Sequence, residues 1–197
     1  MPSEHRHPAR RRRIAEPALR PSPVVLLLVD FINPLNFEGA DDLAPQALLA
    51  ARACARLRRR VRGRGMLTVY ANDNYGVWRA DFDDLWAHCA RLRGVAGEMA
   101  LALRPQRDDC TILKPRHSAF HATPLNLLLT QLRCRRLIVA GLAADNCVLF
   151  TAMDAYLAGY ELWVPEDCTA AEDEEGKRAA LAQMQRVLKA ITRPAAP

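Results

Sequence analysis

The sequence lacks the features that mark several large protein classes. Its 197 residues contain no apolar run close to the ~18 residues that a membrane-spanning helix needs, and the longest strong run, 24–29, ends at Asp30. We find no GxGxxG loop, no Walker loop and no G-x-S-x-G motif. The sequence therefore gives no reason to expect a membrane protein, a dinucleotide or P-loop site, or a serine hydrolase.

Cysteine pairs with metal-binding or redox spacing are also missing, and lysine is scarce. None of the six cysteines has zinc-finger or CxxC spacing, and we identify no secretory signal before them. We therefore expect free thiols in a reducing cytoplasm. Only three of the 28 basic residues are lysines, namely Lys114, Lys177 and Lys189. Because arginine is used elsewhere, each lysine suggests a position where a guanidinium would not serve.

The net charge of +6 is concentrated near the N-terminus. Residues 1–20 contain six arginines against two glutamates, and the rest of the chain is nearly neutral. Such a body gives little reason to expect nucleic acid as a partner. Residues 1–22, rich in Arg and Pro, are predicted to form a mobile arm, and residues 23–193 a single domain.

Beyond the arm, apolar strand-like runs alternate with helical patterns. This alternation predicts βαβ units and an α/β fold, a three-layer α/β/α sandwich with a doubly wound, mainly parallel sheet. The predicted strands are 24–29, 66–71, 111–113, 137–140 and 161–164. The predicted helices are 41–62, two short stretches before residue 103, 123–132, 145–157 and 172–191.

Three chemically capable residues fall at the carboxyl ends of predicted strands, where α/β folds place their sites. Asp30 follows the first strand, Lys114 follows the third, and Cys147 lies in the first turn of the helix after the fourth. A buried carboxylate needs a nearby cation, and Lys114 is the obvious one. A helix N-terminus favours a thiolate, so we expect a lowered pKa for Cys147. Each residue also has a purely structural explanation: Asp30 as a capping residue, Lys114 as a surface lysine and Cys147 as a small buried side chain.

His117 and His121 are four residues apart and would face one way on a helix. They stand, however, between Lys114-Pro115 and the predicted helix start at Thr123-Pro124, so we expect a loop here. A metal pair at these positions is therefore disfavoured.

Three segments resemble the isochorismatase-like cysteine hydrolases, the superfamily that includes nicotinamidases and several amidases. They are VVLLLVDFIN (24–33), ILKPRHSAF (112–120) and VAGLAADNCVLFTAMDAYLAGYELWVPEDCTAA (139–171). The resemblance covers about residues 23–193 and implies the isochorismatase-like hydrolase fold. The last segment is the most specific, because a Gly-x-x-x-Asp-x-Cys stretch runs into a Thr-Ala-x-Asp-Ala helix.

The resemblance implies a role for each of the three residues. Asp30 would take the thiol proton, Lys114 would stabilise the charged pair, and Cys147 would attack a carbonyl. It also implies a cis peptide between Leu142 and Ala143. The N–H groups of Ala143 and Cys147 would then form the oxyanion hole.

One departure from the family bears on metal binding. Metal-binding nicotinamidases carry Asp-x-His after the second strand, whereas this chain has Asp73-Asn74-Tyr75, so we expect no metal and no cofactor. The substrate pocket is expected to involve Asn33, Asn72, Asp73, Trp78 and Phe120, although simple packing would also explain the two aromatic side chains.

The resemblance favours a cytoplasmic cysteine hydrolase that cleaves a C–N amide bond of a small-molecule substrate and assembles as a homo-oligomer. Two alternatives remain open at this point. One is vinyl-ether hydrolysis of the isochorismatase type. The other is a non-catalytic binding protein that uses its basic arm to engage an acidic partner.

Overall fold

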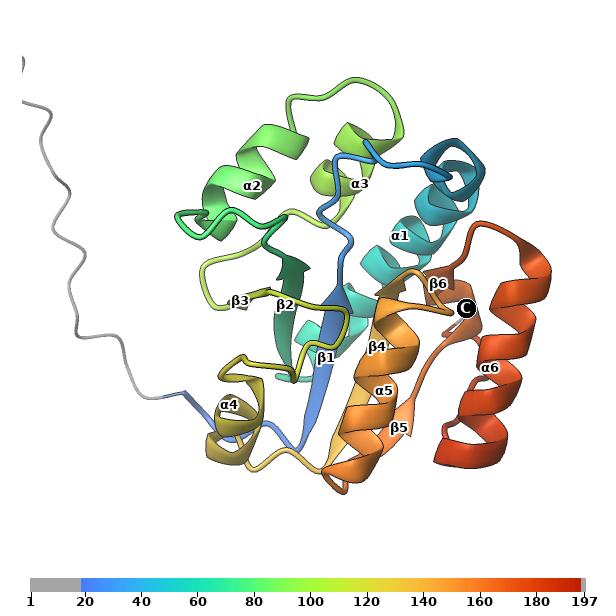
Figure 1. The fold of residues 1–197 in the computed structure, drawn as a ribbon. Coiled ribbons are helices and arrows are strands. Elements are labelled where there is room, and N and C mark those ends of the chain that lie inside the picture. The colour runs from blue at the N-terminus through green and yellow to red at the C-terminus, as the bar shows by residue number, and fades with distance from the viewer. Residues whose placement is uncertain (1–18, 196–197) are drawn as a thin grey trace, which may run out of the picture.

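The computed structural model describes residues 19–195 and contains a six-stranded sheet between two layers of helices (Figure 1). The strands are β1 (Val24–Val29), β2 (Leu67–Asp73), β3 (Cys110–Lys114), β4 (Arg136–Leu142), β5 (Glu161–Trp163) and β6 (Thr169–Ala170). Their order is β3-β2-β1-β4-β5, with β6 paired to β4. All of these pairs are parallel, so the predicted three-layer sandwich is confirmed.

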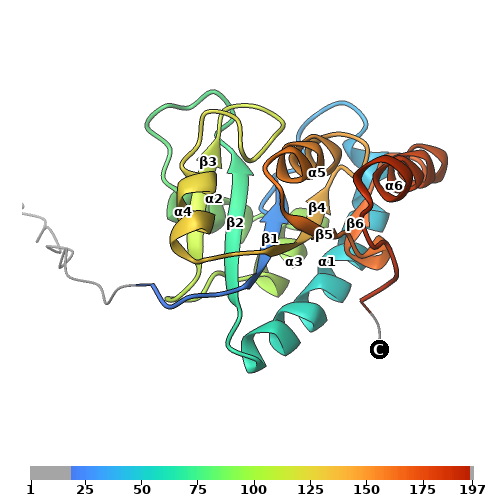
Figure 2. The same cartoon turned by 90° about the horizontal axis from the view of Figure 1, so that it is seen from below.

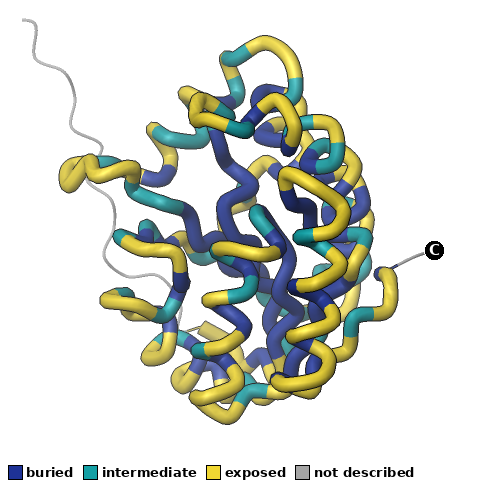
Figure 3. Tube along the Cα trace, turned by 45° about the vertical axis from the view of Figure 1, so that its right-hand side comes forward, coloured by how far each residue is buried: buried dark blue, intermediate teal, exposed yellow. Residues whose placement is uncertain are grey.

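Helices cover both faces of this sheet (Figure 2). They are α1 (Ala40–Gly63), α2 (Phe82–Cys89), α3 (Val95–Ala102), α4 (Leu125–Gln131), α5 (Cys147–Leu157) and α6 (Glu174–Leu188). The first three pack against one face and the last three against the other, through two apolar clusters. Figure 3 shows the buried strands between helices whose outer sides are exposed. Within residues 19–195, no helix has the length and apolar character needed to cross a membrane.

Strand β1 lies at the centre of the sheet because its whole run is apolar. Leu26 and Leu28 enter the cluster beneath α1–α3, whereas Val25, Leu27 and Val29 enter the cluster beneath α4–α6. All five side chains are inaccessible to solvent. Burial of each stabilises the fold by about 1.5–3 kcal/mol. A continuous apolar run is what a strand covered on both faces requires, and β1 has the predicted bounds.

The observed element ends differ from the predicted ones near the site. Strand β2 continues to Asp73, so Asn72 and Asp73 belong to the strand rather than to the loop after it. Helix α5 begins at Cys147 rather than at Asp145, which puts the cysteine in the first helical position. A 3₁₀ turn at Glu166–Cys168 and strand β6 were not predicted.

Of the predicted arm, residues 1–18 lie outside the described residues. Ser22 is held in place, because its N–H donates to the Leu132 carbonyl and its Oγ accepts from the Leu67 N–H. The division between an arm and a domain at residues 22 and 23 stays a prediction.

Candidate active site

The three residues predicted as the catalytic set meet at the carboxyl end of the sheet. Asp30 directly follows β1, Lys114 is the last residue of β3, and Cys147 is the first residue of α5. Lys114 Nζ lies 2.8 Å from Asp30 Oδ2 and 3.5 Å from Cys147 Sγ. One ammonium group therefore contacts both the carboxylate and the thiol.

The carboxylate of Asp30 is fixed at both of its oxygens. Oδ2 pairs with Lys114, and Oδ1 accepts a hydrogen bond of 2.7 Å from the Asp73 backbone N–H. The backbone of Asp30 is left-handed, with φ 52°, a conformation that Asp tolerates better than most residues. This conformation ends β1 and leaves the carboxylate among partners from β2 and β3.

Lys114 is completely buried and has four polar neighbours. Besides Asp30 and Cys147, its Nζ donates to the Arg116 carbonyl at 3.1 Å and lies 3.7 Å from Asp73 Oδ2. A compact ammonium with three rotatable donors suits these scattered acceptors better than a flat guanidinium fork does. The rarity of lysine in the sequence therefore has a structural explanation at this position.

Burial and pairing act in opposite directions on the two buried charges. Burial raises the pKa of Asp30, and Lys114 only partly offsets this. Desolvation lowers the pKa of Lys114, but the Asp30 carboxylate, the Cys147 sulfur and Asp73 outweigh it and leave the pKa above its usual value. Asp30 is thus a stronger base than an exposed carboxylate, and Lys114 stays charged.

The predicted lowering of the Cys147 pKa is wrong. Burial and the Asp30 carboxylate raise the pKa of this thiol to about 12, although Lys114 acts in the opposite direction. Cys147 does lie at the helix N-terminus, but the neighbouring carboxylate and the loss of water have a larger effect on its pKa. These surroundings favour the neutral thiol of Cys147 over the thiolate.

The segment that leads into Cys147 is tightly constrained. A Cβ on Gly141 would lie 2.1 Å from the Val29 carbonyl oxygen, so only glycine allows β4 to approach β1 this closely. The Leu142–Ala143 peptide is cis, as the resemblance implied. The Ala143 carbonyl then accepts from the N–H groups of Asn146 and Val148, which fixes the turn into α5.

Two of the predicted pocket residues brace the loop after β1. Asn33 Oδ1 accepts from the Leu35 N–H at 2.8 Å, and Asn72 Nδ2 donates to the Ile32 carbonyl at 2.8 Å. Both asparagines are buried. Among residues 19–195, Asn72 Oδ1 has no hydrogen-bond partner. Contact of either side chain with substrate stays a prediction.

The two predicted aromatic pocket residues differ in exposure. Phe120 is half-buried and its ring lies 6.1 Å from that of Tyr160, whereas Trp78 is 83% exposed. For Phe120, packing against Tyr160 accounts for its position. A role for Trp78 at the pocket entrance stays a prediction.

Asp73 faces Asp30, Lys114 and Cys147, the candidate catalytic cluster, in a setting that suits a metal poorly. Its Oδ2 is 3.7 Å from the Lys114 ammonium, and its Oδ1 accepts a 2.6 Å hydrogen bond from the Tyr75 N–H. An ammonium at that distance would repel a bound cation, and Tyr75 offers no imidazole. Across residues 19–195, no group of three or more His, Cys, Asp or Glu side chains is arranged to hold a metal ion.

Sequence reasoning missed two residues beside the cluster. His117 Nδ1 lies 3.8 Å from Cys147 Sγ, and its ring stacks on Phe150 with centroids 5.5 Å apart. Desolvation and the charges of Asp30, Asp73 and the nearby thiols raise the pKa of Tyr75, two residues after Asp73. The only sequence signal for His117 was its place three residues after Lys114.

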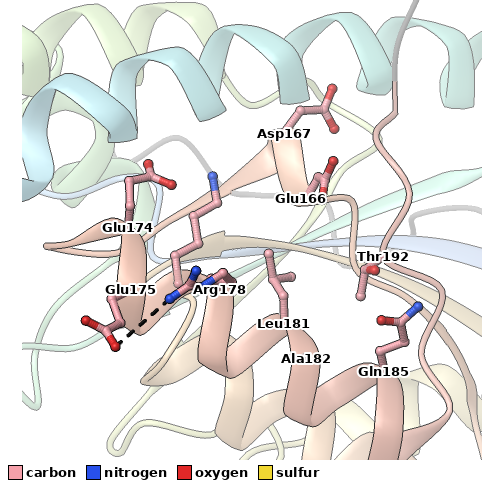
Figure 4. Close-up of a pocket in the computed structure, with 10 residues that line it drawn as sticks. Glu166, Asp167, Glu174, Glu175, Arg178, Leu181, Ala182, Gln185 and Thr192 are labelled. Carbon is pink, nitrogen blue, oxygen red and sulfur yellow. Dashed lines mark ion pairs between the residues drawn. The ribbon is translucent and has the colours of Figure 1, made fainter.

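A separate cavity of about 830 Å³ lies beside α6. Figure 4 shows its lining, which is acidic at Glu166, Asp167, Glu174 and Glu175 and includes the Arg178–Glu175 ion pair. No member of the catalytic cluster lines it. The candidate catalytic residues at the carboxyl ends of β1 and β3 are thus separate from this cavity.

Comparison with known proteins identifies the family. The model of the Isochorismatase domain matches residues 24–195. The chain is 36% identical over 163 residues to the "Uncharacterized isochorismatase family protein YaaI" of Bacillus subtilis (strain 168), a match that covers 83% of this chain and 89% of that protein. It is 27% identical over 173 residues to a maleamate amidohydrolase of Pseudomonas putida, covering 79% of this chain and 76% of that enzyme.

A solved structure supports the same relationship. The N-carbamoylsarcosine amidase of Thermoplasma acidophilum superimposes with a TM-score of 0.69 at 26% sequence identity, covering 88% of this chain and 97% of that one. The family match spans every strand of the sheet and all three residues of the catalytic cluster. The chain therefore belongs to the isochorismatase family and is a hydrolase.

Proposed function

We propose that this hydrolase cleaves a C–N amide bond of a small molecule through an acyl-enzyme on Cys147. The observation that carries the proposal is the position of the Lys114 ammonium, 2.8 Å from the Asp30 carboxylate and 3.5 Å from the Cys147 sulfur. A nucleophile, a base and a fixed cation in mutual contact are the elements that acyl transfer by a thiol needs. The amidase and amidohydrolase names of two relatives support an amide as the substrate bond.

In the first half of the reaction, Asp30 accepts the proton of the Cys147 thiol as the sulfur attacks the amide carbonyl carbon. The raised pKa of Asp30 makes this carboxylate a better proton acceptor. The Lys114 ammonium stays between carboxylate and sulfur, so it stabilises the negative charge wherever the proton resides. The new C–S bond converts the carbonyl oxygen into an oxyanion.

The oxyanion would be held by the backbone N–H groups of Ala143 and Cys147. Because α5 begins at Cys147, the N–H of this residue points out of the helix N-terminus with a free positive dipole end behind it. Collapse of the intermediate breaks the C–N bond, and the nitrogen takes up a proton and leaves as the amine. Water then attacks the thioester, which releases the carboxylic acid and restores the thiol.

The experiment is a panel of small amides analysed by mass spectrometry of the intact protein. An active amide is expected to give an acyl adduct on Cys147, and Cys147→Ala should remove both adduct and turnover. Hydrolysis of a vinyl ether without any adduct would instead support the isochorismatase-type reaction. Turnover retained by Cys147→Ala would overturn the proposal.

We place the enzyme in the cytoplasm and propose that it assembles as a homo-oligomer without nucleic acid, metal or cofactor. All six cysteines are free thiols in the described structure, which suits a reducing compartment. Sedimentation of the purified chain measures the oligomeric state.

A further inference from the structure

His117 is a titratable side chain in contact with the candidate nucleophile that the mechanism above leaves without a task. Its Nδ1 lies 3.8 Å from Cys147 Sγ. Asp30 and Lys114 approach the sulfur from the buried interior, whereas the imidazole is exposed and approaches from the solvent side. The sulfur therefore has one proton-exchanging group on each side.

The loop that carries His117 is fixed to the same helix that carries the nucleophile. Ser118 Oγ donates a 2.6 Å hydrogen bond to Asp154 Oδ2, and the Ala119 N–H donates at 3.0 Å to Thr151 Oγ1. Thr151 and Asp154 follow Cys147 by four and seven residues on α5, so they share its side of the helix. The loop and the nucleophile are thus held as one unit.

The ring of His117 is also restrained. It stacks on Phe150, one turn after Cys147, with an interplanar angle of 28°. A side chain held by its loop at one end and by an aromatic ring at the other loses little further freedom when it acts. This is the kind of preorganisation that acid–base catalysis requires.

Asp30 lies on the interior side of the sulfur, away from solvent. Its oxygens contact the Lys114 ammonium and the Asp73 N–H, and the residue is only 5% exposed. In the tetrahedral intermediate, the scissile nitrogen is two bonds from Sγ. A group 3.8 Å from Sγ on the open side therefore lies within reach of a hydrogen bond to that nitrogen.

We propose that His117 is a second acid–base group of the site, one that protonates the leaving nitrogen and then activates the hydrolytic water. This inference rests on the proposed amide hydrolysis. It divides the proton transfers between two partners: Asp30, paired with Lys114, serves the sulfur, and His117 serves the nitrogen and the water.

Every proton donated in this scheme is returned by the end of the cycle. The cycle starts with a neutral Cys147 thiol, an ionised Asp30 and a protonated His117. Asp30 takes the thiol proton, the C–S bond forms, and His117 gives its proton to the nitrogen as the C–N bond breaks. Neutral His117 next takes a proton from water, whose oxygen attacks the thioester. The expelled thiolate recovers its proton from Asp30, and the carboxylic acid leaves.

If His117 protonates the leaving nitrogen, the effect of replacing it should depend on the leaving group. A purely structural role would not produce this dependence. An amine leaves only when protonated, whereas p-nitrophenolate leaves without a proton. The His117→Gln enzyme should hydrolyse an active amide about 10²-fold more slowly, the lower end of the usual scale for acid–base catalysis. Its acylation by the p-nitrophenyl ester of the same acid, followed as the burst of p-nitrophenol, should change by less than about threefold.

Because deacylation also uses His117, the variant should accumulate acyl-Cys147 during ester turnover, visible by mass spectrometry. The matched control is His121→Gln. His121 is an exposed histidine of the same loop, and its backbone N–H donates to the Ser118 carbonyl. This control should retain parental rates on both substrates.

Two outcomes would overturn the role of His117: amide turnover within about threefold of the parent, or an equal loss of amide hydrolysis and ester acylation. A parent enzyme that forms no adduct on Cys147 with either substrate would instead overturn the proposed function itself.

Discussion

Replacing Lys114 by arginine tests whether the site needs a compact ammonium or only a positive charge. Lys114 is fully buried, and its Nζ contacts Asp30 Oδ2 at 2.8 Å, Cys147 Sγ at 3.5 Å and the Arg116 carbonyl at 3.1 Å. Arginine keeps the charge. Its longer, planar head group cannot reproduce three contacts that point in different directions.

Two effects reduce the rate of the Lys114→Arg enzyme. A guanidinium prefers to hold Asp30 through two parallel hydrogen bonds, which lowers the pKa of a carboxylate that must accept the thiol proton. The larger group also has to fit a buried site, where overpacking costs about 1–3 kcal/mol. We expect kcat/KM to fall by about 10²-fold or more, which corresponds to about 2.7 kcal/mol of barrier.

The assay is kcat/KM on the amide that proves active, with a thermal unfolding curve for each variant. Lys177→Arg, a lysine of α6 remote from the catalytic cluster, is the matched control and should behave as the parent. A folded Lys114→Arg enzyme that loses less than about threefold in kcat/KM would refute the reasoning. Lys114 would then supply a positive charge and nothing more.

Four further predictions concern the same region. Cys147→Ala should reduce amide hydrolysis to background, while its unfolding temperature stays near that of the parent. Cys134→Ala is the control and should stay active. Substantial turnover by Cys147→Ala would refute a thiol nucleophile. Because the pKa of Cys147 is raised to about 12, its alkylation by iodoacetamide should be slow at pH 8 and increase steadily with pH, since only the thiolate reacts. Asp30→Asn should accelerate this alkylation at pH 8, because it removes a negative charge that raises the pKa of the thiol. The same change should suppress hydrolysis, because the base is lost. Slower alkylation would contradict the assigned electrostatics. Prolonged dialysis against EDTA should leave kcat/KM unchanged, and a loss reversed by zinc would contradict the reading of Asp73.

The sequence predicts the layers of this fold well and its short elements poorly. The run 24–29 has its correct bounds because a strand buried on both faces must be apolar throughout. The 3₁₀ turn at Glu166–Cys168 and the two-residue strand after it are too short to show any periodicity. Strand β2 extends through Asn72 and Asp73, two polar residues that a hydrophobic pattern assigns to a loop.

The residues of the candidate site could be predicted from the sequence, but the pKa of the thiol could not. Strand ends in a parallel sheet converge, so Asp30, Lys114 and Cys147 could be placed together without coordinates. The thiol pKa depends on burial and on the distance to a carboxylate, and neither follows from a helix start. The contact of His117 with the sulfur likewise arises from tertiary packing on Phe150.

Lys114 lies on β3, the outermost strand on its side of the sheet. Edge strands open locally at a lower free-energy cost than central ones, in fluctuations that leave the rest of the molecule folded. Five residue pairs with β2 and the hydrogen bond from Asn74 N–H to the Lys114 carbonyl oppose such opening. Each opening would withdraw the ammonium and leave Asp30 in the interior without its cation. In the proposed mechanism, the stability of this sheet edge therefore limits the fraction of time that the enzyme is competent to react.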